Sequence, residues 1–309
     1  MAEDRVTVQV DGRRLSLSNL DKVLYPEAGF TKGQVIDYYA RVAPVILPHL
    51  RDRALTFRRW PGGVQSNPFY EKDAGRHAPD WVKTAKIASG GRGQSSDVNA
   101  YPLVNDVPTL IWAANLAALE LHVPQWTVGP RGARRNPDLL VFDLDPGEPA
   151  TIVECCRVAE RLRDLLAADG LRLYPKTSGS KGMQLYAAVK TATSEDTSAY
   201  AKAAAKKLAA ETPGEVTAAM TKSLRPGKVF IDWSQNNPHK TTVAPYSLRG
   251  RPEPTVSTPV TWDEVEACRR PAQLKFLSDD VLDRVEEVGD LFEDLHDDPV
   301  KLPRARAGQ

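Results

Sequence analysis

The middle of the chain constrains the fold most strongly, because a tight hairpin interrupts an alternation of strands and helices. The segment LLVFDLD (139–145) predicts a strand, and residues 151–170 predict an amphipathic helix that ends at a glycine. The stretch 171–189 predicts two strands joined by a glycine turn, followed by a helix around 196–210 and a short strand at 228–233. Tight hairpins join antiparallel strands, whereas parallel strands need long crossovers. This order predicts an α+β fold with a mixed or antiparallel central sheet and flanking helices.

The flanking regions carry local signals of the same kind. A hairpin is expected over 6–19 with its turn at Asp11-Gly12, and Thr31 with Gln34 forms a capping box before a helix that reaches residue 50. The other expected elements are a kink at Pro44, a strand that ends in a turn over 54–63, a polar glycine-rich loop at 89–97, a strongly apolar helix over 109–122, and an acidic helical segment after Pro252.

Composition excludes several classes of protein. The 309 residues contain no apolar run long enough to span a membrane, and the N-terminus lacks the apolar region of a secretory signal. Cys155, Cys156 and Cys268 form neither a disulfide framework nor a zinc pattern, so a cytoplasmic protein without a membrane partner is expected. Residues 1–250 carry a net charge of +7 and residues 251–309 a net charge of −6, which allows a polyanion to bind one face.

Three aspartates stand in apolar strand settings. Asp143 and Asp145 alternate with a leucine, so on a strand they share one face with Cα atoms roughly 7 Å apart. Asp232 ends another apolar strand, and three converging carboxylates would suit Mg²⁺ or Mn²⁺, of which two ions about 4 Å apart serve polymerases and nucleases. The alternatives are carboxylates that cap a following turn, since Asp-Pro-Gly starts turns, or the D-x-D of a sugar-nucleotide transferase.

The glycine turn KTSGSKG (176–182) has the composition of a phosphate-binding loop. Ser178, Ser180 and the glycines allow backbone N–H groups to approach a phosphate, and Lys181 adds positive charge. The spacing of a Walker A loop is absent, and a strand rather than a helix follows. A plain hairpin turn with a solubilising lysine is the alternative interpretation.

Several motifs, in order, resemble those of one family. FDLDPG (142–147), TSGSKGMQLY (177–186) and KSLRPGKVFIDWSQN (222–236) resemble the three motifs of the archaeo-eukaryotic primase superfamily, and most closely the polymerase domain of bacterial ATP-dependent DNA ligase D. Four further segments are similar to that domain: NLDKVLYPEAGFTK (19–32), RRWPGG (58–63), HVPQW (122–126) and KTTVAPYSLRGR (240–251). The resemblance implies a primase-like catalytic core with an N-terminal α/β extension.

The resemblance also implies roles for individual residues. Asp143 and Asp145 would ligate both divalent ions. Asp232 would complete the coordination of the ion that lowers the pKa of the primer 3′-hydroxyl. The incoming NTP or dNTP would be held by a set of polar side chains: Ser178, Ser180, Lys181, Arg225 and Arg249.

Two positions in the resemblance need separate comment. His122 matches an active-site histidine of the family, and its alternative interpretation is a structural histidine at a helix C-terminus. Gln184 stands where the second motif usually has histidine; its amide keeps a donor but carries no positive charge, so nucleotide binding should lose any contribution of an imidazolium.

DNA-binding residues are implied at the N-terminal side. Lys22 and Lys32 match a lysine pair that binds the 5′-phosphate of a DNA break, and Phe69 and Tyr70 match aromatics that stack on the template base. Stacking is worth roughly 1–3 kcal/mol per base and tolerates any sequence, which suits an enzyme that accepts any end.

The expected function is that of a metal-dependent nucleotidyltransferase that extends primers at gaps or broken DNA ends, working as a monomer. A preference for ribonucleotides and a role in end joining with Ku and a DNA ligase are what the resemblance implies. One catalytic domain is expected over 1–300, with a DNA-end-binding part at about 1–135, a core at about 136–250, an acidic helical segment at 251–300 and a flexible tail at 301–309. No K-x-D-G ligase motif or nuclease module is found, so a stand-alone protein or an excised domain is expected. A de novo primase and a non-catalytic module that bridges DNA ends remain alternatives.

Overall fold

The computed structural model describes residues 5–88 and 98–303, so the loop expected at 89–97 and residues 304–309 of the expected tail lie outside the described residues. The chain divides into two compact units, each built from separated segments. Unit 1 comprises Met1–Arg134, Val243–Ser257 and Phe276–Gly289; unit 2 comprises Arg135–Thr242, Thr258–Lys275 and Asp290–Gln309. Each unit is described by itself.

Unit 1 begins with the expected hairpin. Strands β1 (Arg5–Val10) and β2 (Arg13–Ser18) pair antiparallel, and Asp11 and Gly12 between them have φ values of 45° and 76°. Two successive left-handed residues are the geometry that matches the twist of a two-residue hairpin, which explains the choice of Asp-Gly.

Helix α1 (Lys32–Leu50) follows the small hairpin of β3 (Val23–Tyr25) and β4 (Phe30–Thr31). The predicted capping box is confirmed, because Gln34 N donates to the Thr31 hydroxyl and Thr31 N donates to Gln34 Oε1 at 2.8 Å. These bonds satisfy two of the backbone N–H groups that a helix start leaves without partners.

The prediction of a helix over 109–122 is wrong in its second half. Helix α2 spans Val107–Asn115, Ala117 turns the chain with a φ of 55°, and strand β9 (Ala118–Val123) follows. All six residues of β9 are buried, and a continuous apolar run does not distinguish a buried strand from a buried helix. Strand β9 lies inside a four-stranded sheet of order β17-β9-β5-β6, with β17 (Thr242–Val243), β5 (Thr56–Arg59) and β6 (Phe69–Glu71).

Unit 2 is built on a mixed sheet of order β13-β14-β12-β16-β15. Its strands are β12 (Leu139–Pro146), β13 (Tyr174–Thr177), β14 (Met183–Lys190), β15 (Val216–Thr217) and β16 (Val229–Asp232), with β18 (Val300–Lys301) beside β14. The pairs along this order are antiparallel except β15 with β16, and β18 also runs parallel to β14. The predicted α+β class with a mixed sheet is confirmed.

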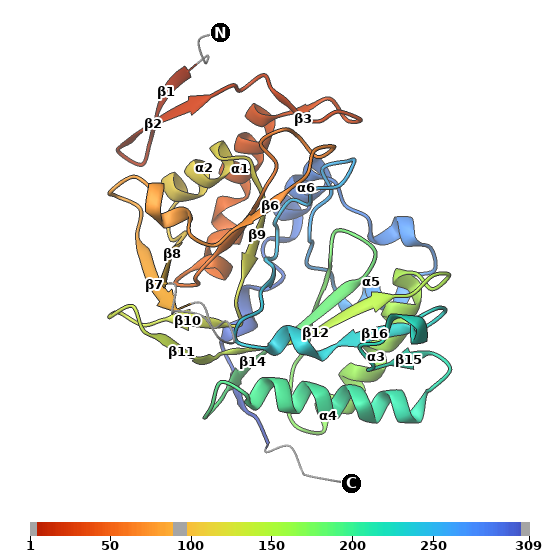
Figure 1. Cartoon of the computed structure of the whole chain (residues 1–309). Helices are drawn as coiled ribbons and strands as arrows, with labels where there is room; N and C mark the ends of the chain where they lie inside the picture. Colours follow the sequence, from red (N-terminus) through yellow and green to blue (C-terminus); the bar gives the residue numbers. More distant parts are fainter. Residues whose placement is uncertain (1–4, 89–97, 304–309) are drawn as a thin grey trace. The chain divides into compact units, whose positions relative to one another are not determined.

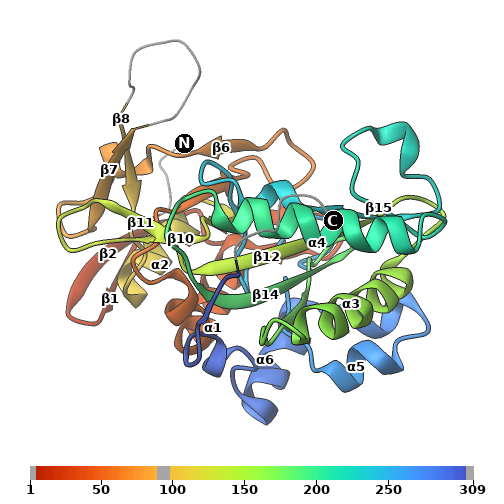
Figure 2. The same cartoon turned by 90° about the horizontal axis from the view of Figure 1, so that it is seen from below.

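Helices α3 (Ile152–Ala167) and α4 (Asp196–Glu211) contact each other and β12, so both lie on one side of this sheet (Figure 1 and Figure 2). Strand β12 is buried on both faces: its odd-numbered Leu139 and Val141 pack in a cluster with Tyr186 and Phe292, so the even-numbered Leu140, Phe142 and Leu144 lie on the other face, toward the helices. The cysteine Sγ of Cys155 on α3 donates to Leu144 O at 3.5 Å. By the same alternation, Asp143 and Asp145 share the face of Leu139 and Val141, opposite α3 and α4.

The remaining elements complete the two units. They are β7 (Thr84–Ala88), β8 (Val98–Pro102), β10 (Trp126–Val128), β11 (Arg134–Pro137), α5 (Trp262–Ala267), α6 (Ser278–Val288) and the 3₁₀ turns η1 (Ala74–His77), η2 (Lys222–Leu224), η3 (Trp233–Asn236), η4 (Pro271–Leu274) and η5 (Glu293–His296). Among the described residues, no helix combines the length and the apolar character needed to cross a membrane.

Gly182 fixes the glycine turn against β12. A Cβ atom at this position would lie 2.0 Å from Leu144 O, the carbonyl between the two aspartates of β12. Only glycine allows so close an approach, so the turn at 178–182 is held directly beside Asp143 and Asp145.

We expect Gly182→Ala to lower the free energy of unfolding by about 3 kcal/mol, because the added methyl group forces a backbone carbonyl to move. Urea unfolding followed by circular dichroism measures the change. Gly214→Ala is the matched control, since nothing lies within 4 Å of its Cβ position. Equal stability of the two variants would contradict the close approach.

Candidate active site

The three aspartates share one face of the unit 2 sheet. Asp143 of β12 is paired directly with Asp232 of β16, and Asp145 lies two residues further along β12. Residues paired across antiparallel strands, and residues i and i+2 on one strand, project from the same side. The register therefore brings together carboxylates that are 87 to 89 positions apart in the sequence.

Burial and like charges dominate the electrostatics at Asp143. Burial and the neighbouring charges of Asp145 and Asp232 raise the pKa of Asp143 to about 7, while a hydrogen bond from Gln184 acts in the opposite direction. In that bond Gln184 Nε2 donates to Asp143 Oδ1 at 3.0 Å. Near neutral pH, the Asp143 carboxyl therefore binds a proton or requires a cation.

Asp232 also has a local structural role. Its Oδ1 accepts from Ser234 N at 3.0 Å and its Oδ2 accepts from Gln235 Nε2 at 2.9 Å, so the side chain caps η3. The Lys240 ammonium lies 3.9 Å from Asp232 Oδ2. The turn-capping interpretation, which the sequence left open for these carboxylates, thus describes what Asp232 does in this structure.

The donor set fits a divalent ion that also takes ligands from water and substrate. Within residues 5–88 and 98–303, no three His, Cys, Asp or Glu side chains are arranged to hold a metal by themselves. Mg²⁺ in proteins typically uses one or two carboxylates together with water and substrate phosphates. Asp143 and Asp145 supply carboxylates of that kind, with Asp232 opposite Asp143.

The glycine turn is closed by Ser178, through its side chain and through a backbone bond from Ser178 N to Gly182 O at 2.9 Å. The Ser178 hydroxyl accepts from Ser180 N and from Gly182 N, each at 3.2 Å. Lys181 Nζ donates to Glu148 Oε1 at 2.7 Å, and both side chains are largely exposed. Exposed ion pairs contribute little, so a phosphate can displace Glu148 at small cost.

Arg225 belongs to the same neighbourhood. Its guanidinium lies 3.7 Å from the centre of the Phe230 ring, and Phe230 is the cross-strand partner of Asp145. A Cβ at Gly147 would lie 2.0 Å from Arg225 O, so the Asp-Pro-Gly segment and the arginine loop are held together. The structure thus brings residues of all three sequence motifs into one part of unit 2.

His122 and Arg249 lie in unit 1, where Glu120 connects them. Glu120 on β9 is fully buried; its carboxylate accepts from Arg249 Nε at 3.1 Å and lies 2.8 Å from His122 Nε2. Arg58 Nη1 donates to the same carboxylate at 3.3 Å. The interpretation of His122 as a histidine at a helix C-terminus is wrong, because residue 122 is part of a strand.

The charges in this cluster compensate one another. Burial raises the pKa of Glu120, but the hydrogen bond with His122 and the charges of Arg249 and Arg58 hold it well below its usual value. Burial lowers the pKa of His122 despite the neighbouring carboxylate, which favours the neutral imidazole. With its Nε2 hydrogen-bonded to Glu120, neutral His122 carries its proton there and presents Nδ1 as an acceptor.

Phe69 and Tyr70 point in different directions, because they are neighbours on strand β6. The Tyr70 ring packs edge-on to His122 at 5.6 Å and beneath the Arg58 guanidinium at 5.2 Å. The Phe69 ring instead faces the guanidinium of Arg59 at 5.2 Å. Both rings are about half exposed, at 45% and 57%, but only Tyr70 adjoins the Glu120 cluster.

Lys22 and Lys32 are neighbours with different surroundings. Lys32 N donates to Lys22 O at 2.8 Å, so the β3–β4 hairpin brings the two residues together. The Lys32 side chain is buried, and its ammonium donates to Ser18 O at 2.6 Å. Lys22 is exposed.

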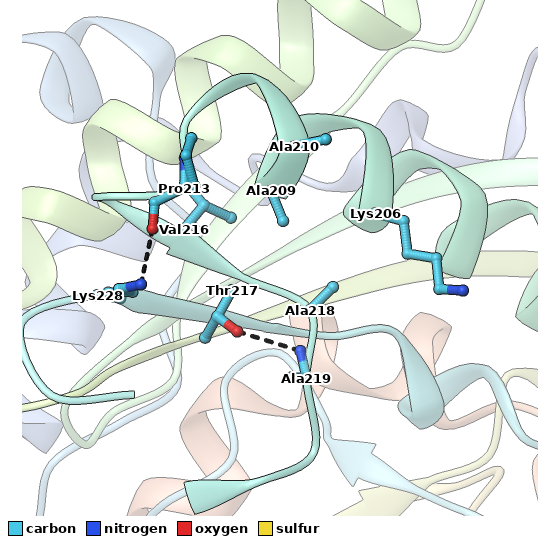
Figure 3. Close-up of a pocket in the computed structure, with 9 residues that line it drawn as sticks. All are labelled: Lys206, Ala209, Ala210, Pro213, Val216, Thr217, Ala218, Ala219 and Lys228. Carbon is cyan, nitrogen blue, oxygen red and sulfur yellow. Dashed lines mark hydrogen bonds between the residues drawn. The ribbon is translucent and has the colours of Figure 1, made fainter. Parts of the chain in front are cut away.

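A cavity of about 400 Å³ lies elsewhere in unit 2, between α4 and the segment that contains β15 (Figure 3). Lys228 Nζ donates to Pro213 O at 2.7 Å at its border, and the Thr217 hydroxyl accepts from Ala219 N at 3.2 Å. None of the three aspartates lines this cavity, so it is not part of the carboxylate site.

Sequence reasoning missed several charged residues of these clusters, among them Glu120, Lys240 near Asp232, and Lys176, whose charge acts on Asp143. Glu120 had a readable signal, since it is a charged residue within the strongly apolar run 109–122, whereas Lys176 stands in a polar stretch and its burial is seen only in the structure. Lys240 had no such signal in the sequence, because its distance from Asp232 depends on the conformation of the chain that follows η3.

A mixed sheet that presents paired aspartates beside a glycine turn defines a domain of the primase-polymerase class. The family model "LigD, primase-polymerase domain" matches residues 31–292. The chain therefore belongs to the LigD primase-polymerase domain family, which confirms the resemblance read from the sequence motifs.

Relatives support this assignment. The chain is 46% identical over 288 residues to the multifunctional non-homologous end joining protein LigD of Mycolicibacterium smegmatis, covering 92% of this chain and 36% of that protein. It is 32% identical to the bifunctional LigD of Bacillus subtilis, covering 94% of this chain and 45% of that protein. A solved structure, the polymerase domain of Mycobacterium tuberculosis ligase D in complex with DNA, aligns with a TM-score of 0.85 at 45% identity over 93% of this chain and 99% of that one.

We expect Asp143→Asn to stabilise the protein at pH 8, in EDTA, by on the order of 2 kcal/mol, and much less at pH 5. The raised pKa means that the folded state binds this proton more tightly than the unfolded state, so the contribution of Asp143 is lost as pH rises toward 7. Thermal unfolding at both pH values measures the difference. The exposed Asp37→Asn on α1 is the control, and a gain independent of pH would contradict the assignment.

Proposed function

We propose that this chain is a template-dependent nucleotidyltransferase that extends a primer strand at gaps or broken DNA ends. The single observation that carries the proposal is the carboxylate row of Asp143, Asp145 and Asp232 on one sheet face, with the glycine turn locked beside it by Gly182. A hard anionic site next to a serine-rich turn that carries the exposed ammonium of Lys181 suits a metal-bound triphosphate. We further propose that ribonucleotides are preferred, as the family resemblance implies.

The residues would divide the work of phosphoryl transfer. Asp143, Asp145 and Asp232 would hold two Mn²⁺ or Mg²⁺ ions, which supply charge neutralisation and a more acidic primer 3′-hydroxyl when bound. Ser178, Ser180 and Lys181 would bind the triphosphate, which exchanges the Lys181–Glu148 pair for a stronger charge-assisted contact.

Other side chains would contribute phosphate contacts and base recognition. Arg225 would reach the triphosphate from beside Asp145, whereas His122 and Arg249 would act as a unit organised by Glu120. Phe69 and Tyr70 would stack on the template, with Tyr70 the ring on the His122 side.

The biological setting is proposed from the relatives, whose names describe non-homologous end joining. We propose that the DNA substrate carries a 5′-phosphate bound by Lys22 and Lys32, and that Ku and a DNA ligase are partners in end joining. De novo priming is the second candidate activity. Labelled nucleotides incubated with single-stranded template and no primer distinguish the two.

Asp143→Ala and Asp145→Ala should each reduce nucleotide addition by at least about 10³-fold, because the remaining carboxylates cannot hold both ions. Extension of a 5′-phosphorylated gapped duplex with ribonucleotides or deoxyribonucleotides, in Mn²⁺ or Mg²⁺, measures the rate. Binding of the same DNA should persist. Asp164→Ala, an exposed carboxylate on α3, is the control. Normal extension by either site variant would refute the proposal, and binding without any addition by the wild-type chain would favour a bridging module.

Lys22→Ala should weaken binding to a phosphorylated gap by about tenfold and leave binding to the unphosphorylated gap nearly unchanged. Lys22 is the exposed member of the pair, so its replacement does not disturb the bond from Lys32 to Ser18. Fluorescence anisotropy with both duplexes measures the ratio, and Lys207→Ala on α4 is the control. Equal losses on the two duplexes would assign Lys22 a general backbone contact.

A further inference from the structure

Lys176 is a charged residue in a place where lysine is rarely found. It lies in the middle of β13, its relative exposure is 0%, and every residue of that strand is buried. Lysine side chains are almost never fully buried without compensation. The ammonium lies 5.4 Å from the centre of the Tyr186 ring, which supplies part of that compensation.

The strand register aligns Lys176 with the carboxylates. Lys176 pairs with Gln184, Gln184 pairs with Asp143, and Asp143 pairs with Asp232. One row of side chains thus crosses four adjacent strands on a single face. Since neighbouring strands lie about 4.8 Å apart, the backbone of Lys176 is roughly 10 Å from that of Asp143.

The row has a defined order of charge. The Lys240 ammonium approaches Asp232 at one end, Lys176 stands at the other, and neutral Gln184 lies between Lys176 and Asp143. Gln184 is fixed by two bonds: its Nε2 donates to Asp143 Oδ1, and its Oε1 accepts from the Tyr186 hydroxyl at 3.3 Å. The Tyr186 side chain therefore contacts two members of this row: its ring faces the Lys176 ammonium and its hydroxyl donates to the Gln184 amide.

We propose that Lys176 is a positioning residue of the nucleotide site, whose buried ammonium supplies from β13 the positive charge that Gln184 does not provide. This inference rests on the proposed nucleotidyl transfer. The ammonium acts through the field it places on the carboxylate row and through Tyr186 and Gln184, without touching the substrate. Gln184 on β14 thus supplies the hydrogen-bond donor, and Lys176 on the adjacent strand β13 supplies the positive charge, that a single histidine at position 184 could supply together.

The fixed positive charge of Lys176 should affect nucleotide binding and metal binding in opposite directions. It attracts the triphosphate and repels the divalent cations, so its removal should weaken nucleotide binding and strengthen metal binding. At roughly 10 Å and an intermediate effective dielectric constant, each effect should be on the order of threefold to tenfold. Loss of packing alone would weaken both.

Lys176→Met is the test, because methionine keeps an unbranched side chain of similar length and removes the charge. We expect the KM for ATP on a 5′-phosphorylated gapped duplex to rise about fivefold with a smaller change in kcat. Calorimetric titration with ATP in Mg²⁺ should show the same loss. The Kd for Mn²⁺ without nucleotide, measured from the electron paramagnetic resonance signal of free Mn²⁺, should fall about threefold.

Two further variants separate charge from packing. Lys176→Arg should retain the wild-type affinities within about twofold, because it preserves the charge. Lys202→Met is the matched control, since Lys202 also lies near an aromatic ring, 4.7 Å from that of Trp233, but projects from the exposed side of α4. If Lys176→Met does not fold by circular dichroism, Lys176→Gln provides the same comparison.

The outcomes distinguish this inference from the proposed function. Unchanged affinities in Lys176→Met, or a loss of both nucleotide and Mn²⁺ affinity, would overturn the role of Lys176 while wild-type extension still supports the polymerase. Absence of nucleotide incorporation by the wild-type chain would overturn the proposed function. The Mn²⁺ titration tests the charge of Lys176 on the carboxylate row without any turnover.

Discussion

The pairing of Asp143 with Asp232 places two carboxylates opposite each other in the interior of a sheet, where like charges repel and water is scarce. The surroundings of this pair all reduce that cost in some way. Gln184 donates to one carboxylate, Lys240 approaches the other, and Ser234 and Gln235 donate to Asp232. The raised pKa of Asp143 shows that this compensation is incomplete. A site with uncompensated negative charge is suited to bind cations, which is the property that phosphoryl transfer requires.

Two close backbone contacts bring neighbouring loops against the strand that carries Asp143 and Asp145. Gly182 brings the serine turn against Leu144 O, and Gly147 brings the arginine loop against the end of β12. Neither loop could approach so closely with a side chain at these glycines. The three motifs are widely spaced in the sequence, and these two contacts define where they meet. Their geometry is therefore a property of the backbone more than of individual polar side chains.

Much of the fold could be predicted because its signals are local. Asp11-Gly12, the Thr31–Gln34 box and the glycine turn at 178–182 each depend on a few adjacent residues, and all three form as expected. The prediction of a single helix over 109–122 was wrong because an unbroken apolar run fits a buried strand and a buried helix equally well. The opposite directions of Phe69 and Tyr70 could have been read from the two-residue period of a strand.

Nonlocal pairing explains what the sequence could not provide. That Asp143 meets Asp232 depends on β16 entering the sheet beside β12, and the contact of Glu120 with Arg249 joins residues 129 positions apart. A chain can satisfy each local pattern with several strand orders, and only packing selects one.

The two interpretations of the aspartate motif are compatible for the same physical reason. A carboxylate at a strand end is held in one rotamer by the turn that it caps, as Asp232 is by Ser234 and Gln235. A metal ligand must also be held in one rotamer before the ion arrives, or ordering it would weaken binding. Under the proposed function, capping would therefore prepare Asp232 for coordination, with the lone pairs not used by η3 still able to accept. The structural role that sequence reasoning treated as the alternative would thus contribute to the proposed one.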